Sequence, residues 1–266
     1  MEEPKIKTIG EHREYMHGIV RLKLFFLHRW LKEHPEETFQ NALRNRVDIY
    51  RKTHANKGLL NPVEFYFDEE PWLTMEKQAE EIFEQYKDDE AAFEEKAFQV
   101  FRPSLDKRLL KDYLDKSGLR GYQCGSLRHN LEANKDNPEA ISLGFHIANA
   151  VAPHSIFDDP QYLKNCLLQL CDKAETEYGA TVIATGTWLN QNKKWLSYFP
   201  QEWLDNMSEP VTDIQWHYGF WGQFISARGT LNERYADILR STGKMPYYPC
   251  RSRCRISELR KHLETI

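Results

Sequence analysis

The strongest constraint on the fold is a helix signal in the second half of the chain that stands between two segments of alternating side chains. Asp159 is a good N-terminal cap, Pro160 suits the first helical position, and Gly179 suits the C-terminal cap. The flanking segments, residues 141–151 and 181–189, alternate with the period of two that is typical of β-strands. Because a helical connection of this length joins parallel strands, the sequence predicts a βαβ unit.

Helical signals dominate the first part of the chain. Apolar residues recur every three or four positions up to Pro35, which opens a second helix, and again after Pro71 as far as a C-cap at Gly118. Two further alternating segments, residues 122–130 and 214–225, predict two more strands. We expect an α/β or α+β fold in which a helical N-terminal region packs on a mixed β-sheet that contains the βαβ unit.

These patterns divide the chain into two regions. Residues 1–120 form the expected helical region, and residues 121–266 form the expected α/β region that carries the site. We find no repeat or linker between them and expect one cooperative unit. After the last expected strand, Thr230 and Glu233 have the spacing of a capping box, which predicts a helix that ends at Gly243.

Composition and charge narrow the class of protein. Hydrophobic residues make up 41% of the chain, which is enough apolar surface for a folded core. The net charge of −4 argues against nucleic acid as a partner, and no apolar run approaches the roughly 20 residues that span a bilayer. The first residues lack the apolar stretch of a signal peptide, so we expect a cytoplasmic protein with five reduced cysteines. Acidic helices and a basic C-terminal segment are compatible with pairing within the chain or in a homo-oligomer.

Two of the expected strands each present a histidine on a face of small side chains. His146 shares its face with Ser142 and Gly144, and His217 shares its face with Gly219. Small neighbours leave space beside an imidazole, which an ordinary core would fill with a large side chain. We interpret this pattern as a pocket for a small polar or anionic metabolite, the expected partner of the protein.

The remaining strands and the loop after the second strand supply further groups for this pocket, because ligands bind beyond the carboxyl ends of parallel strands. The expected catalytic residues are His146, His217 and Cys124. The expected substrate-binding residues are Arg128, Asn149, His154, Ser155, Trp188, Asn190, Trp221 and Gln223. Asp158 and Asp159, in the same loop, are expected to cap the following helix.

Two kinds of enzyme fit such a pocket. His146 or His217 could act as a general base, with Cys124 or Ser126 as a nucleophile, in group transfer or hydrolysis. Alternatively, His146 and His217 could hold a divalent metal such as iron, zinc or manganese, although no diagnostic ligand spacing is present. A non-catalytic protein that binds a ligand or a partner also fits the aromatic-rich segments, although Trp195, Phe199 and Trp203 have the spacing of a buried helical stripe.

One segment resembles a known family. The order of strand, loop, helix and strand over residues 141–200, with "TWLN" and then "LSYF", is similar to the second half of the GNAT acyltransferases. That resemblance implies acyl-CoA as a cofactor. The loop "VAPHSIFDDP" departs from the glycine-containing pattern of the family, so acetyl-CoA binding is not carried over.

Overall fold

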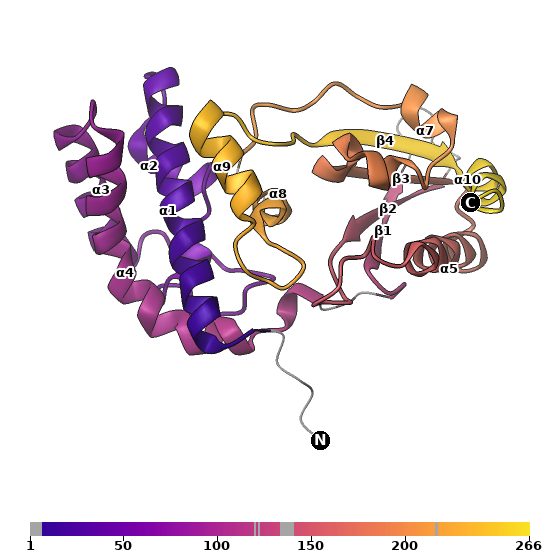
Figure 1. Ribbon diagram of the computed structural model, residues 1–266, viewed down its shortest axis with the longest axis horizontal. Helices are drawn as coiled ribbons and strands as arrows, with labels where there is room; N and C mark the ends of the chain where they lie inside the picture. Colours follow the sequence, from indigo (N-terminus) through magenta and orange to yellow (C-terminus); the bar gives the residue numbers. More distant parts are fainter. Residues whose placement is uncertain (1–6, 120, 122, 134–140, 216–217) are drawn as a thin grey trace. The chain divides into compact units, whose positions relative to one another are not determined.

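The computed structural model describes residues 7–119, 121, 123–133, 141–215 and 218–266. The chain forms two compact units, each described here by itself (Figure 1). The first unit comprises Met1–Gly118 and Asp213–Pro246, and the second comprises Leu119–Thr212 and Tyr247–Ile266. The first unit thus ends at Gly118, close to the change of sequence pattern near residue 120. The segment Asp213–Pro246, which contains the helix signal that ends at Gly243, belongs to the same unit as the N-terminal helices. No helix in the described part of the chain is long and apolar enough to cross a membrane.

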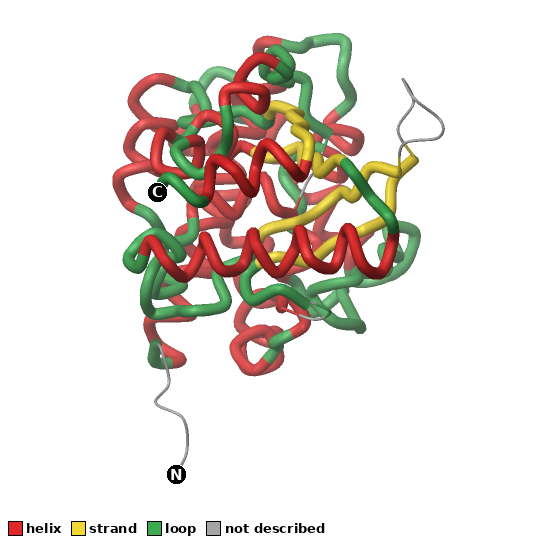
Figure 2. Tube along the Cα trace, turned by 90° about the vertical axis from the view of Figure 1, so that its right-hand side faces the viewer, coloured by secondary structure: helices red, strands yellow, loops and turns green. Residues whose placement is uncertain are grey.

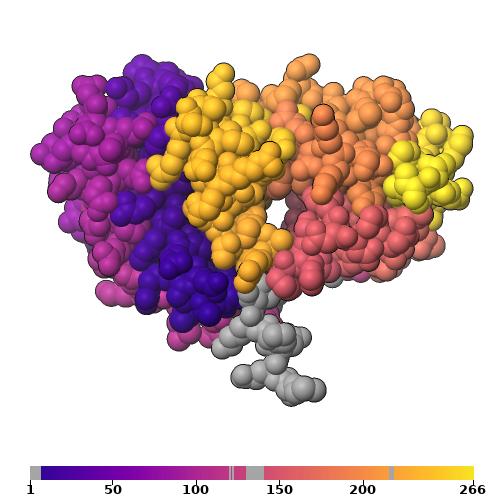
Figure 3. Space-filling model, in the orientation of Figure 1, coloured from indigo at the N-terminus to yellow at the C-terminus, as the bar shows by residue number. Residues whose placement is uncertain are grey.

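The first unit is helical. Its elements are α1 (Ile9–Glu33), α2 (Phe39–Asn45), the 3₁₀ helix η1 (Tyr50–Lys52), α3 (Trp72–Gln85), α4 (Glu90–Leu114), α8 (Tyr218–Trp221), η4 (Gly222–Phe224) and α9 (Glu233–Thr242). The long helices α1 and α4 pack against each other, and α3 packs on α4. The segment that carries α8 and α9 lies beside α1 (Figure 3).

Local capping fixes where these helices begin. Thr8 caps α1 in a capping box, in which its hydroxyl accepts from Glu11 N at 3.1 Å and the Glu11 carboxylate accepts from Thr8 N at 2.7 Å. The expected start of the second helix at Pro35 is wrong, because Thr38 caps α2. The capping box expected at Thr230 is also wrong, because Asn232 caps α9. The predicted C-cap at Gly243 is confirmed in the left-handed conformation.

The second unit contains a mixed four-stranded sheet in the order β1-β2-β3-β4. Its strands are β1 (Leu127–Ala133), β2 (Ile141–Ile147), β3 (Val182–Thr187) and β4 (Cys250–Arg255). Strands β2 and β3 are parallel and are joined through α5 (Pro160–Tyr178), which confirms the predicted βαβ unit, whereas the other two pairs are antiparallel. Asp159 and Gly179 cap α5 as predicted. The smaller helices of this unit are η3 (Trp188–Gln191), α6 (Lys193–Leu196), α7 (Gln201–Asp205) and α10 (Ile256–Leu263), and the 3₁₀ helix η2 (Ser117–Leu119) lies at the point of the chain where the first unit ends.

The strand predicted at residues 214–225 is wrong. Residues 218–224 of that segment form α8 and η4, and the fourth strand is β4. In β4, Cys250, Ser252 and Cys254 are buried and alternate with arginines. This strand has the period of two, but its inward residues are small and only weakly apolar, so the hydrophobic pattern does not reveal it.

One face of the sheet carries the core of the second unit. Leu143, Phe145 and Ile183 point to this face and pack with leucines of α5, with α10 and with the aromatic residues of α6 and α7. Figure 2 shows α5 and α10 side by side over the strands. Trp195, Phe199 and Trp203 are buried as predicted, although they belong to two short helices and the link between them.

Asn190 organises this core. Its amide nitrogen donates to the backbone oxygens of Thr185 at 3.2 Å and Cys250 at 2.8 Å. Its amide oxygen accepts from the indole nitrogens of Trp195 at 3.0 Å and Trp203 at 3.2 Å. The side chain is fully buried and all of its hydrogen-bonding groups are used, so it has none left for a substrate. These contacts give Asn190 a structural role and argue against the expected role in substrate binding.

Replacing Asn190 should destabilise the second unit strongly. In Asn190→Leu, two buried indole N–H groups and two carbonyl groups lose their partner, and each unsatisfied group costs about 1–3 kcal/mol. We expect a loss of more than about 3 kcal/mol in the free energy of unfolding, measured by urea denaturation. Asn206→Ala is the matched control, because the Asn206 amide makes one exposed hydrogen bond to Arg253 O, and a similar loss in this control would contradict the assignment.

Candidate functional site

The sheet brings two of the expected site residues together. Arg128 on β1 pairs directly with His146 on β2, so both side chains lie on the face opposite the core. On the same face, Gly144 pairs with Ala184 on β3, and Gly186 pairs with Arg251 on β4. A Cβ atom at Gly186 would lie 3.3 Å from Arg251 Cγ, so the glycine lets the arginine stem lie close to the sheet. This face thus has a floor of small residues between basic side chains.

The loop after β2 uses its polar side chains for its own structure. The Asn149 amide donates to His154 O at 2.8 Å and accepts from Val151 N at 3.1 Å. Ser155 Oγ accepts from Phe157 N at 3.2 Å, and the Asp158 carboxylate accepts from Ser155 N at 2.8 Å. His154 is exposed. The structure therefore gives Asn149 and Ser155 local roles in the turn that leads to α5.

Cys124 lies in the hydrophobic core of the second unit and not on the face that carries His146. Burial raises the pKa of its thiol. Both findings argue against a nucleophile, because the reactive form of cysteine is the thiolate. The phase of the alternation changes in a turn between Cys124 and Leu127, whose backbones pair with each other.

The other expected pocket residues do not gather around His146 within the second unit. Trp188 stacks on Tyr247, with 5.9 Å between ring centroids. Trp221 and Gln223 belong to the first unit, where Trp221 Nε1 donates to Arg46 O at 3.2 Å. His217 lies outside the described residues. Within the described ranges, no three His, Cys, Asp or Glu side chains are grouped as metal ligands.

A different set of polar residues lies inside the first unit. A cavity of about 20 Å³ has room for one water-sized group. Three cations and one carboxylate line it, together with apolar and aromatic residues; the wall consists of Tyr15, Ile19, Lys23, Asp48, Arg51, Lys52, Trp221, Gly222 and Ile225. Burial of so many charged groups in a helical unit is rare unless they are paired or functional.

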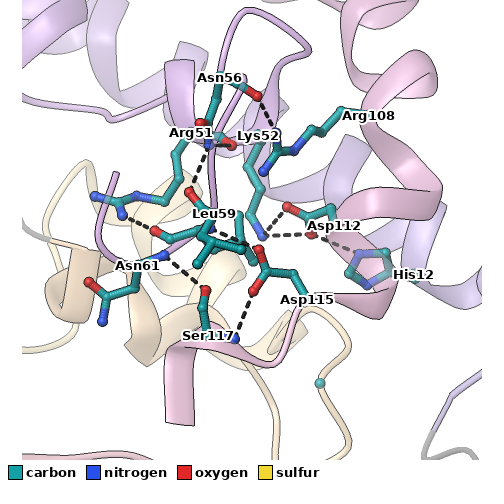
Figure 4. Close-up of polar contacts among 12 residues, drawn as sticks. His12, Arg51, Lys52, Asn56, Leu59, Asn61, Arg108, Asp112, Asp115 and Ser117 are labelled. Carbon is teal, nitrogen blue, oxygen red and sulfur yellow. Dashed lines mark hydrogen bonds and ion pairs between the residues drawn. The ribbon is translucent and has the colours of Figure 1, made fainter. Parts of the chain in front are cut away.

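The Asp112 carboxylate connects helix α4 to η1 and to α1. Asp112 on α4 accepts from Lys52 Nζ at 2.9 and 3.1 Å and is 2.8 Å from His12 Nε2 (Figure 4). Burial would raise the pKa of Asp112, but the Lys52 ammonium and these hydrogen bonds outweigh it and lower the pKa to about 2. Burial lowers the pKa of His12, and its Nδ1 atom is buried without a partner in the described structure.

Asp48 and Arg51 form the next part of the cavity wall. Arg51 Nε donates to Asp48 Oδ2 at 2.8 Å, and both side chains are buried. Asp48 has a positive φ of 47°, a conformation that non-glycine residues rarely adopt. Its Oδ1 atom is buried and has no partner among the described atoms. A buried carboxylate oxygen without a partner in a cavity wall favours a binding role over a purely structural one.

The loop that follows η1 is fixed to α4 by further polar contacts (Figure 4). The Arg108 guanidinium donates to the backbone oxygens of Asn56 and of Gly58, the latter at 2.8 Å. The Asp115 carboxylate accepts from Leu60 N at 2.9 Å. These contacts hold Arg51 and Lys52 in place at the cavity wall.

Lys23 differs from the other two cations of the wall. It is 5% exposed, and its ammonium group donates to the backbone oxygen of Asp48 at 3.0 Å. It also lies 5.2 Å from the centroid of the Trp221 ring. Among the described residues, no carboxylate lies within 4 Å of Lys23 Nζ. Burial, and after it the nearby Lys52 and Arg51, lower the pKa of Lys23 to about 7 despite the opposing effect of Asp48.

The sequence contains a signal for this cluster in the helical N-terminal region, outside the expected strands. Lys23 lies on the apolar stripe of α1, four residues after Ile19 and three before Phe26. Asp112 lies likewise on the stripe of α4, three residues after Leu109. A charged residue on the apolar stripe of a helix must be paired or solvated inside the fold, so it marks a candidate site.

Comparison with known proteins assigns the chain to no family. No protein-family model, curated protein or solved structure matches the chain. The resemblance of residues 141–200 to the GNAT acyltransferases therefore gains no support beyond the order of β2, α5 and β3.

Removing one member of the Lys52–Asp112 pair should cost more than removing both. Lys52→Met leaves a buried carboxylate, and Asp112→Asn leaves a buried ammonium, so each should lower the free energy of unfolding by about 3–5 kcal/mol. The double variant should lose clearly less than the sum of the two single losses. Urea denaturation of the four proteins measures this coupling. Additive losses would show that the two side chains do not depend on each other.

The burial of Lys23 should give the protein a distinctive pH dependence. Since the pKa is about 7 in the folded chain and 10.5 unperturbed, the unfolded chain binds more protons between these values, and wild-type stability rises with pH. Lys23→Met lacks this contribution. We expect the difference in free energy of unfolding to shift by a few kcal/mol in favour of the wild type from pH 7 to pH 10.

Lys32→Met on the same helix is the control for this experiment. Its side chain is half exposed and pairs with the exposed Asp88. Chemical denaturation at pH 7, 8.5 and 10 should therefore show no trend for this variant relative to the wild type. An equal trend in both variants would contradict the assignment to Lys23.

Proposed function

We propose that the protein is an enzyme that binds a small anionic metabolite in the cationic cavity of the first unit. The observation that carries this proposal is the position of Lys23, a buried ammonium in the cavity wall whose hydrogen bond goes to a backbone carbonyl. A buried charge without a counter-ion is costly, so an anion in the cavity would be stabilised.

The neighbouring charges support an anion over a neutral ligand. In the cavity wall, the charge of Arg51 is balanced by Asp48, and that of Lys52 by Asp112 behind it, which leaves Lys23 in excess. Lys7 adds positive charge close by, since its amine lies 4.7 Å from the Tyr15 ring and Lys52 lies 5.5 Å from the same ring. Burial and the repulsion from Lys52 lower the pKa of Lys7 to about 8.

A buried acceptor without a partner supports an anionic ligand that donates a hydrogen bond as well as carrying the negative charge. Asp48 Oδ1 is such an acceptor in the cavity wall. The small volume limits the ligand to a compact molecule, or to one whose charged end enters the cavity. These features fit the charged end group of a small anionic metabolite, with the rest of the molecule outside the cavity.

A second candidate site for the same class of ligand is the sheet face of the second unit. The direct pairing of Arg128 with His146 favours it, because a guanidinium beside an imidazole can hold an anion next to a general base. The cytoplasmic location expected from the sequence is part of the same proposal, and the five free thiols fit a reducing compartment.

Small carboxylates should stabilise the protein through Lys23. We expect acetate, propionate, pyruvate or inorganic phosphate, at constant ionic strength and pH 6.5, to raise the melting temperature by several degrees, because a ligand at about 100 times its Kd adds about 2.7 kcal/mol. In Lys23→Met the dissociation constant should rise about tenfold, equivalent to about 1.4 kcal/mol, while Lys32→Met keeps wild-type affinity.

The same titrations distinguish the two candidate sites. If His146→Ala weakens binding and Lys23→Met does not, the ligand binds at the sheet face. If none of the four anions changes the melting temperature of the wild type, the proposed anion binding is wrong.

A further inference from the structure

The sheet face opposite the core of the second unit carries a row of residues that crosses all four strands. Arg128 on β1 pairs with His146 on β2, and Gly186 on β3 pairs with Arg251 on β4. The register of the parallel strands β2 and β3 brings His146 and Gly186 to neighbouring positions. The row therefore consists of Arg128, His146, Gly186 and Arg251. It lies near the carboxyl ends of the two parallel strands, where ligands of α/β sheets bind.

The middle of this row is an open floor of small residues. Gly144 and Ala184 form the adjacent row, and His146, Gly186 and Arg251 are exposed. Neighbouring strands lie about 4.8 Å apart, so the backbones of His146 and Arg251 are about 10 Å apart, with only Gly186 between them. A group of the size of a phosphate has room over Gly186, between the two basic side chains.

The charge of this face favours an anion. Arg251 makes no ion pair among the described residues, whereas Arg255, on the same strand and the same face, pairs with Glu202 at 3.1 Å. Arg128 adds a second guanidinium at the other end of the row. Guanidinium groups bind phosphate oxygens through two parallel hydrogen bonds, so an exposed arginine without a carboxylate partner suits a phosphate ligand.

An aromatic pair lies at the carboxyl end of β3. Trp188 follows this strand directly and stacks on Tyr247, with 5.9 Å between ring centroids and 16° between ring planes. Both side chains are partly exposed. Trp188 lies two residues beyond Gly186, so their Cα atoms are at most about 7 Å apart. Gln191 Oε1 accepts from Tyr248 N at 2.8 Å, which fixes the segment of Tyr247 beside η3.

A basic row and an aromatic pair at this separation match one kind of ligand. From them we infer that this face binds a nucleoside 5′-phosphate, with the phosphate between His146 and Arg251 and the base against Trp188. In such a molecule a ribose separates the planar base from the phosphate, so both ends reach their groups at once. The inference rests on the sheet face proposed above as the second candidate site, and it specifies the ligand of that site.

Calorimetric titration of the full chain tests the inference. AMP, GMP, CMP and UMP are titrated at pH 7.5 and constant ionic strength, and adenosine and ribose 5-phosphate serve as partial ligands. We expect at least one nucleotide to bind at least about tenfold more tightly than either partial ligand, because only the nucleotide contacts both the basic row and the aromatic pair.

Two variants separate the parts of the site. Arg251→Met should raise the dissociation constants of the nucleotide and of ribose 5-phosphate about tenfold. Trp188→Leu should raise that of the nucleotide about tenfold and leave that of ribose 5-phosphate unchanged. Arg255→Met is the matched control and should keep wild-type affinity, because Arg255 already pairs with Glu202.

A third variant tests the floor of the site without changing a charge or an aromatic ring. Gly186→Val places a side chain where the phosphate is expected, and its Cβ atom would lie 3.3 Å from the flexible Arg251 Cγ atom. This variant should weaken binding of the nucleotide and of ribose 5-phosphate as strongly as Arg251→Met does. An unchanged melting temperature without ligand would show that the fold is retained.

The outcomes separate this site from the cavity of the first unit. Nucleotide binding that is weakened in Arg251→Met and Gly186→Val, but not in Arg255→Met or Lys23→Met, supports the inference. Absence of nucleotide binding, or binding that depends on Lys23 and not on Arg251, overturns it, while the small-anion titrations of Lys23→Met test the cavity independently. A single-stranded oligonucleotide that binds more than about tenfold more tightly than any mononucleotide would also overturn it, in favour of nucleic acid.

Discussion

The Asp112 carboxylate is the interaction on which the polar interior of the first unit depends. It joins α4 to Lys52 of η1 and to His12 of α1, and the loop after η1 is then fixed to the same helix through Arg108. A buried ion pair of this kind adds little net stability compared with apolar side chains of the same size, yet the loss of one partner is costly. Its value therefore lies in placing charged groups at a defined position, which is what a binding cavity requires.

Lys23 differs in its contacts from the other two cations of the cavity wall, Arg51 and Lys52. Arg51 and Lys52 each have a carboxylate, whereas the Lys23 ammonium is held by a carbonyl oxygen and an indole face. A lysine in such surroundings has two ways to lower its free energy, which are to bind an anion or to lose its proton.

The fold of the second unit could be predicted where its signals are local. Asp159, Pro160 and Gly179 mark the ends of α5, and the strands on either side alternate, so the βαβ unit follows from neighbouring residues. The fourth strand could not be found in this way. Aromatic residues in the segment 214–225 imitate the alternation of a strand, whereas β4 turns cysteine and serine side chains inward and arginines outward. The role of Asn190 depends on partners as far along the chain as Cys250, and no local pattern indicates them.

The pattern of histidines on faces of small residues predicts only part of the candidate site. This pattern predicts Arg128 and His146, which lie side by side on β1 and β2. It places Cys124 on the wrong face of the sheet, because the alternation of side chains changes phase in the turn between Cys124 and Leu127. Charged residues on the apolar stripes of α1 and α4 are a stronger signal for a buried site, because burying Lys23 or Asp112 requires a partner wherever the helices pack. Helical periodicity predicts that such residues face the interior, but it does not predict which partner each one meets. Lys52 meets Asp112 across 60 positions of the chain, and Lys23 meets the Asp48 carbonyl oxygen and the Trp221 ring only through the packing of distant segments on α1.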